Sequence, residues 1–307
     1  MPSFTFTGPY GDIECVVNNY KLNDVVLIMA HGFRGSRDGG GRSTAFAKLA
    51  EGVCKVVRFN FNGSQILSRQ IEELQAVNKN LVLVLLSGNA VEMPWVDKVP
   101  AIVQGWYLGS MGGKSIANVL SGKVNPSGKL PFSFPVKLTD CGAHAFDELS
   151  YPGDGIKQVY KEDILVGYRW HDTKKIPAAF AFGHGLSYTQ FEYGKAIASA
   201  KKITEDGTLE IAVKVKNVGD VVGKEVVQLY IGDDKCSVVR PLKELKHFEK
   251  IALNPGEEKT VTFTVTVDDL KFYDDSKKDW MAETGKFKAY IGSSSIDIRT
   301  IVPFVLE

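Results

Sequence analysis

The spacing of apolar residues changes once along the chain, and this change limits the possible folds more than any other feature. In the longer, N-terminal part, apolar runs such as VVLIMA at 25–30 alternate with segments of helical spacing such as KSIANVLSG at 114–122. In the remainder, apolar and polar residues alternate at every second position, as in TLEIAVKVKNVG at 208–219. The first pattern predicts an α/β domain over 1–190, with a mostly parallel sheet flanked by helices. The second predicts a β-sandwich over 191–307.

The charges of the chain are balanced and do not indicate a partner. Lys and Arg number 37 against 36 Asp and Glu, so the formal net charge of +1 creates no field that would gather nucleic acid or an anionic membrane. The N-terminus has neither a basic nor an apolar leader segment, and no apolar run is long enough to span a bilayer. We therefore expect a cytoplasmic protein without nucleic-acid or membrane partners, and the sequence does not indicate its oligomeric state.

The cysteines argue against two further kinds of site. They are widely spaced and form no CxxC pair, which is not the pattern of a disulfide framework or of a zinc site. All four are interpreted as reduced and mostly buried small hydrophobic residues: Cys15, Cys54, Cys141 and Cys236. We expect neither a bound metal nor a cofactor.

Long, ordered motifs connect most of the chain to a known family. The run at 76–135, which includes GWYLGSMGGKSIANVLSG and NPSGKLPFSFP, is followed by VYKEDILVGYRWHD at 159–172 and FAFGHGLSYT at 180–189. These motifs resemble the C-terminal α/β-sandwich domain of glycoside hydrolase family 3, the β-glucosidases and β-xylosidases. The stretches VKNVGDVVGKEVVQLYIGD at 215–233 and GKFKAYIGSSS at 285–295 are similar to the fibronectin type III-like domain that ends many enzymes of that family.

This resemblance covers about 66–307 and leaves the first 65 residues to another origin. The segment MAHGFRGSRDGGGRST at 29–44 resembles the front of an α/β-hydrolase esterase and is similar to the cinnamoyl and feruloyl esterases. We therefore interpret the chain as a chimera whose junction lies within 62–77. Because both parents build parallel α/β sheets, the strand at 25–29 is predicted to pair into the same sheet as the strand at 81–86.

The chain lacks part of what glycoside hydrolysis requires. The family resemblance implies that a TIM-barrel domain carries the aspartate nucleophile, and that the glutamate acid/base comes from a loop upstream of the part that matches here. Retaining hydrolysis needs two carboxyl groups about 5 Å apart. An acid/base role is open to several acidic residues, although a solvated or ion-paired role is expected for each: Glu72, Glu73, Glu92, Asp97, Asp147, Asp154, Glu162, Asp163 and Asp172.

Ester hydrolysis asks for a serine, a histidine, an orienting acid and N–H donors for the oxyanion. His31, Gly32 and Phe33 lie between a predicted strand and a predicted helix at 43–50, where the free N–H groups of a helix start bind anions. This segment is the predicted oxyanion turn. The alternative is a glycine-rich turn without a catalytic role.

The nucleophile is less certain, because the chain contains no G-x-S-x-G pentapeptide. Ser110 has an apolar strand before it, Gly112 two residues after it and a helix next, but Leu108 stands where the first glycine belongs. The backbone N–H of Met111 would then add an oxyanion donor. Ser87, at the end of the most apolar strand, is the second choice, and a purely structural role is open to both serines.

Candidate bases are few, since the chain has five histidines. The set Ser110, Asp172 and His184 follows the order serine, acid, histidine that α/β-hydrolases use. The same serine with Asp163 and His171 is also permitted. His184 lies between two glycines and has an alternative role as a buried histidine bonded to a backbone carbonyl.

Two functions therefore compete. One is a carboxylic ester hydrolase for small aryl or acyl esters, such as feruloyl or acetyl esters of plant cell-wall polysaccharide. The other is a barrel-less set of family 3 β-glucosidase or β-xylosidase accessory domains, which would hydrolyse O-glycosyl bonds only with a partner. The esterase is favoured, because only ester chemistry can be assembled from residues that are present. The expected substrate is a small-molecule ester or a carbohydrate.

Overall fold

The computed structural model describes residues 3–8, 11–18, 26–31, 55–59 and 64–307. The chain forms two compact units, Met1–Val124 and Asn125–Glu307, and each is described by itself. The predicted helix at 43–50 lies outside the described residues, as do Gly32 and Phe33 of the predicted oxyanion turn. Within the described ranges, every helix is too short or too polar to cross a bilayer.

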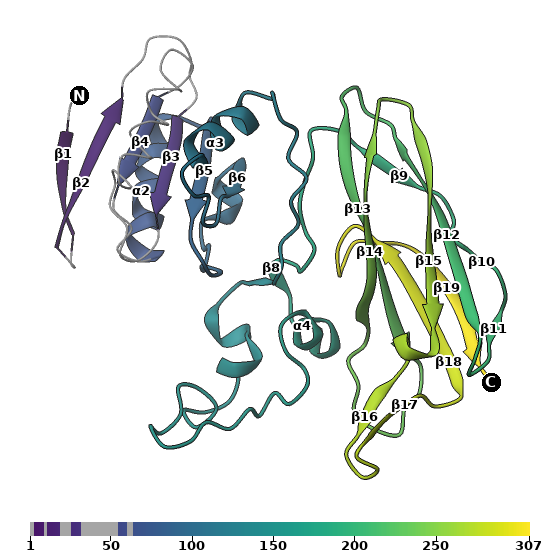
Figure 1. The fold of residues 1–307 in the computed structure, drawn as a ribbon. Coiled ribbons are helices and arrows are strands. Elements are labelled where there is room, and N and C mark those ends of the chain that lie inside the picture. Colours follow the sequence, from purple (N-terminus) through teal and green to yellow (C-terminus); the bar gives the residue numbers. More distant parts are fainter. Residues whose placement is uncertain (1–2, 9–10, 19–25, 32–54, 60–63) are drawn as a thin grey trace. The chain divides into compact units, whose positions relative to one another are not determined.

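The first unit is built on a six-stranded sheet with the order β1-β2-β4-β3-β5-β6 (Figure 1). Its strands are β1 (Ser3–Gly8), β2 (Gly11–Asn18), β3 (Val26–His31), β4 (Lys55–Phe59), β5 (Leu81–Leu86) and β6 (Ala101–Gln104). Its described helices are α2 (Ser64–Val77), the single turn η2 (Val96–Lys98) and α3 (Gly112–Leu120).

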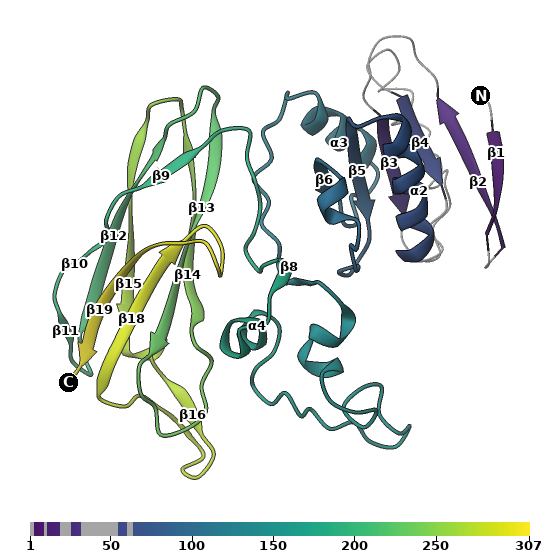
Figure 2. The same cartoon turned by 180° about the vertical axis from the view of Figure 1, so that it is seen from behind.

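Apolar residues on both faces of the central strands explain why helices cover them. Leu27 of β3 and Val84 of β5 form a buried cluster with Ile116 of α3. The alternate residues of β5 point to the other face, because successive side chains of a strand alternate. These residues are also buried: Leu81, Leu83 and Leu85. Helix α2 lies over this side of the sheet (Figure 2).

The predicted pairing of the two central strands is confirmed. β3 and β5 run parallel, with Val26 opposite Leu81 and His31 opposite Leu86. β4 and β6 extend this parallel arrangement on either side. The apolar runs of the sequence therefore indicated the centre of this sheet correctly.

The predicted mostly parallel character of the fold is wrong. β1 and β2 form an antiparallel hairpin, with Gly8 opposite Gly11, and β2 pairs antiparallel with β4, so the sheet is mixed. The segment 3–8 alternates Phe with Ser and Thr, which is the two-residue period of a strand, whereas the apolar runs that indicated a parallel sheet begin only at residue 25. Over the described chain, strand residues also outnumber helical residues.

Residues 125–190 open the second unit and contain little regular structure, where the sequence predicts further α/β layers. The short strands β7 (Phe134–Pro135) and β8 (Ala178–Phe180) pair antiparallel. Single turns η3 (Leu138–Asp140) and η4 (Gly142–His144) precede the seven-residue helix α4 (Tyr168–Lys174). Lys175 ends α4 in the left-handed conformation, with a φ of 56°. Loops make up the rest of this stretch.

The predicted β-sandwich is confirmed. One sheet consists of β10 (Ile197–Ala198), β12 (Thr208–Asn217) and β15 (Glu258–Thr266), with β9 (Phe191–Tyr193) also paired to β12. The other has the order β11-β19-β18-β13-β14, formed by β11 (Lys202–Ile203), β13 (Gly223–Asp233), β14 (Glu244–Leu253), β18 (Gly285–Gly292) and β19 (Ile298–Leu306). The turn η5 (Val267–Asp269) and a hairpin of β16 (Phe272–Asp274) and β17 (Asp279–Met281) lie between β15 and β18.

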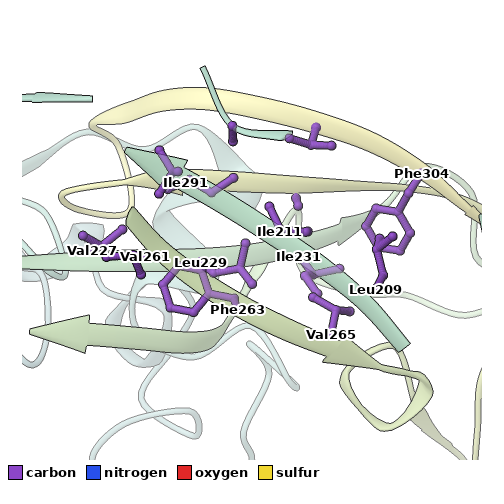
Figure 3. Packing of buried hydrophobic residues seen from close by; sticks show 14 of the residues in the cluster. Leu209, Ile211, Val227, Leu229, Ile231, Val261, Phe263, Val265, Ile291 and Phe304 are labelled. Atoms are coloured by element: carbon purple, nitrogen blue, oxygen red, sulfur yellow. The ribbon is translucent and has the colours of Figure 1, made fainter. Parts of the chain in front are cut away.

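The sandwich core follows directly from the two-residue alternation. Every second residue of β12 is buried, beginning at Leu209 and Ile211, and the polar residues between them face solvent. Figure 3 shows these side chains meeting those of β13 and β15, such as Leu229 and Phe263, between the two sheets. Full burial of one such aliphatic side chain contributes about 1.5–3 kcal/mol.

Candidate functional site

The turn that carries Ser110 lies between β6 and α3. Ser110 is exposed, and α3 begins two residues later at Gly112. Gly109 has a φ of 64°, a left-handed conformation that suits glycine. A Cβ at Gly112 would lie 2.8 Å from the Cβ of Leu108, so the Leu108 side chain fills the space where the turn approaches the helix. The turn thus differs from a nucleophile elbow at the position that decides its shape.

Ser87 follows β5, and its hydroxyl is engaged in local structure. It donates a hydrogen bond to the carbonyl oxygen of Asn89 at 2.9 Å and accepts one from Nε2 of Gln104 at 3.2 Å. The same Gln104 amide also donates to the Ser87 carbonyl oxygen at 3.0 Å. These bonds tie together the ends of β5 and β6, which is a structural role.

Asp172 and His184 belong to the second unit, whereas Ser110 belongs to the first. The Asp172 carboxylate pairs with Nζ of Lys243 at 2.5 Å, and both side chains are buried. Burial raises the pKa of Asp172 above its ordinary value, while the hydrogen bond and charge of Lys243 lower it. Sequence reasoning missed this partner, because nothing in a local pattern connects two residues 71 positions apart.

The histidines occupy different surroundings. The ring of His184 lies 5.3 Å from that of Phe180, and burial, followed by the nearby charge of Lys129, lowers the pKa of His184. It is His171 whose ring bonds a backbone carbonyl, with Nδ1 3.1 Å from the oxygen of Ile176. The predicted triad therefore stays a prediction from the sequence alone.

The predicted oxyanion group is described only in part. His31 is the last residue of β3, while Gly32 and Phe33 lie outside the described residues. Met111 immediately precedes α3, and its carbonyl oxygen accepts a hydrogen bond from the Ser115 hydroxyl at 3.1 Å. This group also stays a prediction.

Three of the acidic residues considered for glycoside chemistry are held by neighbouring groups. Glu72 pairs with Nζ of Lys98 at 2.5 Å. The hydrogen bond from Lys161 lowers the pKa of Asp147, and backbone N–H groups lower the pKa of Asp154. A general acid must keep its proton near neutral pH, which requires a raised pKa. Asp147 and Asp154 are therefore poor candidates for the acid.

Glu162 differs from these surface carboxylates because it is buried. Its Oε2 has no hydrogen-bond partner, and a Cβ at Gly142 would lie 2.9 Å from the Glu162 Cβ, so the two segments are in close contact. Buried carboxylates are usually paired, which makes this one unusual. Among the described residues, no group of three or more His, Cys, Asp or Glu side chains is placed to hold a metal ion.

Comparison with protein families finds a matching family model for each of the two parts of the chain. The model of the glycosyl hydrolase family 3 C-terminal domain matches residues 12–188, and that of the fibronectin type III-like domain matches residues 225–295. The first match alone covers more than half of the chain and includes most of the segment assigned above to an esterase.

Relatives and solved structures agree with these matches. β-Glucosidase BoGH3A of Bacteroides ovatus is 63% identical over 234 residues, which are 76% of this chain and 31% of the relative. A β-glucosidase of Rhizobium radiobacter is 43% identical over 299 residues, 96% of this chain and 34% of the relative. The crystal structure of the Kluyveromyces marxianus β-glucosidase superposes with a TM-score of 0.76 at 34% identity, covering 92% of this chain and 31% of that one. The chain thus spans about a third of the length of these relatives.

These findings correct the interpretation of the N-terminal segment. The chimera is wrong, because the family match begins at residue 12 and the Rhizobium relative aligns with nearly the whole chain. The esterase and feruloyl esterase functions are wrong for the same reason. A strand followed by His-Gly is common to many α/β sheets and does not separate one family from another. From the α/β sheet to the fibronectin type III-like sandwich, the chain belongs to glycosyl hydrolase family 3.

Proposed function

We propose that this chain serves as the C-terminal α/β and fibronectin type III-like part of a β-glucosidase, and that it supports hydrolysis of β-glucosides only with a partner that supplies the nucleophile. The observation that carries the proposal is the 63% identity to the Bacteroides ovatus β-glucosidase. The substrate class follows from the name of that relative, and a β-xyloside is the alternative substrate.

The need for a partner is supported by the chemistry of the described carboxylates. Glycoside hydrolysis uses two carboxyl groups on opposite sides of the scissile bond. In the second unit Asp147 and Asp172 are paired with lysines, and Asp154 is bonded to backbone N–H groups. Each of these three is engaged by a neighbouring group, and the family resemblance implies a nucleophile on a TIM-barrel domain, so we expect the nucleophile from a separate segment.

The surface of the loop at 146–166 also supports a partner. Several large apolar side chains of this loop are exposed, with Ile156 at 95% and Tyr160 at 70% of their full accessibility. A cluster of exposed apolar residues usually marks a surface that another protein segment covers. The occupant we propose is the segment of the family 3 relatives that this chain does not match, because that segment makes up about two thirds of their length.

Complementation tests the proposal. The purified full chain is assayed with p-nitrophenyl β-glucoside, p-nitrophenyl β-xyloside and methyl ferulate, alone and mixed with the separately produced, unmatched part of the Bacteroides ovatus relative. We expect no turnover by either part alone and β-glucoside hydrolysis by the mixture. Turnover by the chain alone, or an inactive mixture of two parts that are each folded, would contradict the proposal.

Variants of the exposed loop separate assembly from chemistry. Tyr160→Asp should prevent the mixture from regaining activity, because a charge at a buried contact is costly. Ile197→Asp, at a residue of equal exposure on β10 of the sandwich, is the matched control and should leave complementation unchanged. Equal loss with both variants would show that the loop has no special part in assembly.

A further inference from the structure

A small cleft opens in the second unit where residues before β7, the end of α4, strand β8 and the β18–β19 connection meet. Its volume is about 330 Å³. It combines polar and apolar residues from these four segments: Ser133, His171, Asp172, Lys175, Ile176, Pro177, Ala178, Ala181, Ser295 and Ile296. No step of the proposed function uses this cleft.

Backbone hydrogen bonds fix the walls of the cleft. The N–H of Phe182 donates to Oγ of Ser133 at 3.2 Å, and the carbonyl oxygen of Phe182 accepts from the N–H of Ser295 at 2.9 Å. Phe182, which lies two residues after β8, thus holds both the segment before β7 and the β18–β19 connection. Because the walls are tied together in this way, the cleft is preformed and a ligand need not order it.

Two lining side chains have hydrogen-bonding capacity left. Nδ1 of His171 faces the Ile176 carbonyl, which only accepts, so Nδ1 carries the hydrogen and Nε2 of the neutral ring is an acceptor. The Ser133 oxygen accepts from Phe182 and keeps its own proton to donate. The hydroxyl of Ser295 also has no hydrogen-bond partner, but its oxygen is fully buried and offers no surface to the cleft.

The charge of the cleft favours a neutral ligand. The carboxylate of Asp172 is already compensated by Nζ of Lys243 at 2.5 Å. Lys175 is exposed at the rim, where solvent screens its charge. Apolar side chains of Ile176, Pro177 and Ile296 complete the lining. A ligand for this site presents an apolar face together with hydroxyl groups that both donate and accept.

We propose that this cleft binds a neutral cyclic polyol of monosaccharide size. Its volume is at the lower end of ligand pockets, which range over about 300–1,000 Å³, so it suits a single ring rather than an oligosaccharide. Hydroxyl groups of such a ring can donate to His171 Nε2 and accept from the Ser133 hydroxyl. The proposal concerns a binding site alone and does not depend on the proposed function.

The test uses the full chain and three neutral probes, D-glucose, D-xylose and myo-inositol, in calorimetric titrations. Gluconate serves as an anionic probe of similar size. His171→Asn keeps a donor for the Ile176 carbonyl but removes Nε2, and Ala178→Leu fills the cleft. His171→Asn should weaken binding of at least one neutral probe about fivefold, the equivalent of one lost hydrogen bond, and Ala178→Leu should abolish binding because it fills the cleft. Lys174→Gln, next to the cleft but not lining it, is the matched control and should bind normally.

A second measurement keeps the test valid if a variant does not fold. Amide chemical shifts of the unaltered chain are followed as each neutral probe is added. The largest changes should fall at 171–178 and 293–297. Saturable binding that shifts other residues, binding that survives Ala178→Leu, or no binding of any neutral probe would each overturn the proposal. Tighter binding of gluconate than of the neutral probes would overturn the assignment of a neutral ligand.

Discussion

The β-sandwich and the stretch at 125–190 lie in one compact unit, yet different forces hold them. The sandwich has one large core of alternating apolar residues from both sheets. The stretch instead meets the sandwich through separate contacts, which include the rings of Tyr168 and Tyr230, the ion pair of Lys129 with Glu225 and several polar contacts of α4. The Tyr168 hydroxyl accepts from the N–H of Leu245 at 2.8 Å, the Thr173 hydroxyl from the N–H of Leu242 at 2.9 Å, and Asp172 pairs with Lys243.

This difference teaches where one substitution has the most effect. A core of many similar contacts loses only the contacts of the residue that is replaced. A buried ion pair is different, because removal of one partner leaves the other charge buried and uncompensated. The comparison therefore predicts that the polar junction is the more sensitive of the two regions, although it is the smaller.

Lys243→Met gives the largest expected effect. The free energy of unfolding should fall by about 3–5 kcal/mol, the usual cost of breaking a buried pair from one side. Denaturant unfolding monitored by tryptophan fluorescence measures the loss. The double variant Lys243→Met with Asp172→Leu is the control and should recover most of it, since no charge then remains buried. A double variant as unstable as the single one would show that packing, not charge, explains the effect.

Leu229→Ala should cost somewhat less, about 2–5 kcal/mol, because it removes a fully buried side chain and leaves a cavity. The same denaturant titration measures it. Ile301→Ala, at a half-exposed position of β19, is the matched control and should change stability by no more than about 0.5 kcal/mol. If Leu229→Ala is tolerated as well as its control, the sandwich core is not the source of stability that the comparison assumes.

The same contrast explains how much the sequence predicted. The strands of the sandwich were predictable because alternation at Leu209 and Ile211 is a local signal that tertiary packing only reinforces. The parallel pairing of β3 with β5 was predictable from apolar runs. The hairpin of β1 and β2 carried the right alternation, but the parallel prediction was based on the continuous apolar runs that follow it in the sequence.

The junction was not predictable, because its partners are far apart in sequence. No sequence pattern connects Lys243 with Asp172 or His171 with the carbonyl of Ile176, and these contacts form only through the way the chain folds back. The esterase prediction was wrong for a related reason, while the candidate triad itself stays a prediction. Serine, acid and histidine in the right order occur by chance in a chain of this length, and order contains no distances.

Acidification sharpens the comparison further. Because burial raises the pKa of Asp172 above its ordinary value of 3.8, the folded chain holds this proton more tightly than the unfolded chain does. The stability that comes from this tighter proton binding is fully present below the ordinary pKa and is lost as pH rises through the folded value. In Lys243→Met the pKa of Asp172 in the folded chain should rise further, because the hydrogen bond and the charge that lower it are gone. The deficit of Lys243→Met should therefore shrink as pH falls from 7 toward 4.

The measurement is the unfolding free energy of the unaltered chain and of Lys243→Met at a series of pH values. The double variant with Asp172→Leu is the reference, since it has no carboxyl at this position. If the stability lost in Lys243→Met does not change with pH, then Asp172 is not the buried charge that this substitution leaves without a partner.

The smallest effect is expected at an ion pair of the same stretch that faces solvent. Nζ of Lys161 lies 2.5 Å from Oδ2 of Asp147, as close as the buried pair, but the two side chains are 33% and 60% exposed. Solvent and salt screen such a pair, and water replaces the lost partner. Although the hydrogen bond from Lys161 lowers the pKa of Asp147, Lys161→Met should leave the unfolding midpoint unchanged within scatter. The matched experiment is Lys243→Met under identical conditions. Similar losses of stability from Lys161→Met and Lys243→Met would mean that burial does not decide how much an ion pair of this stretch contributes. The sensitivity of the stretch could then not be explained by buried charge.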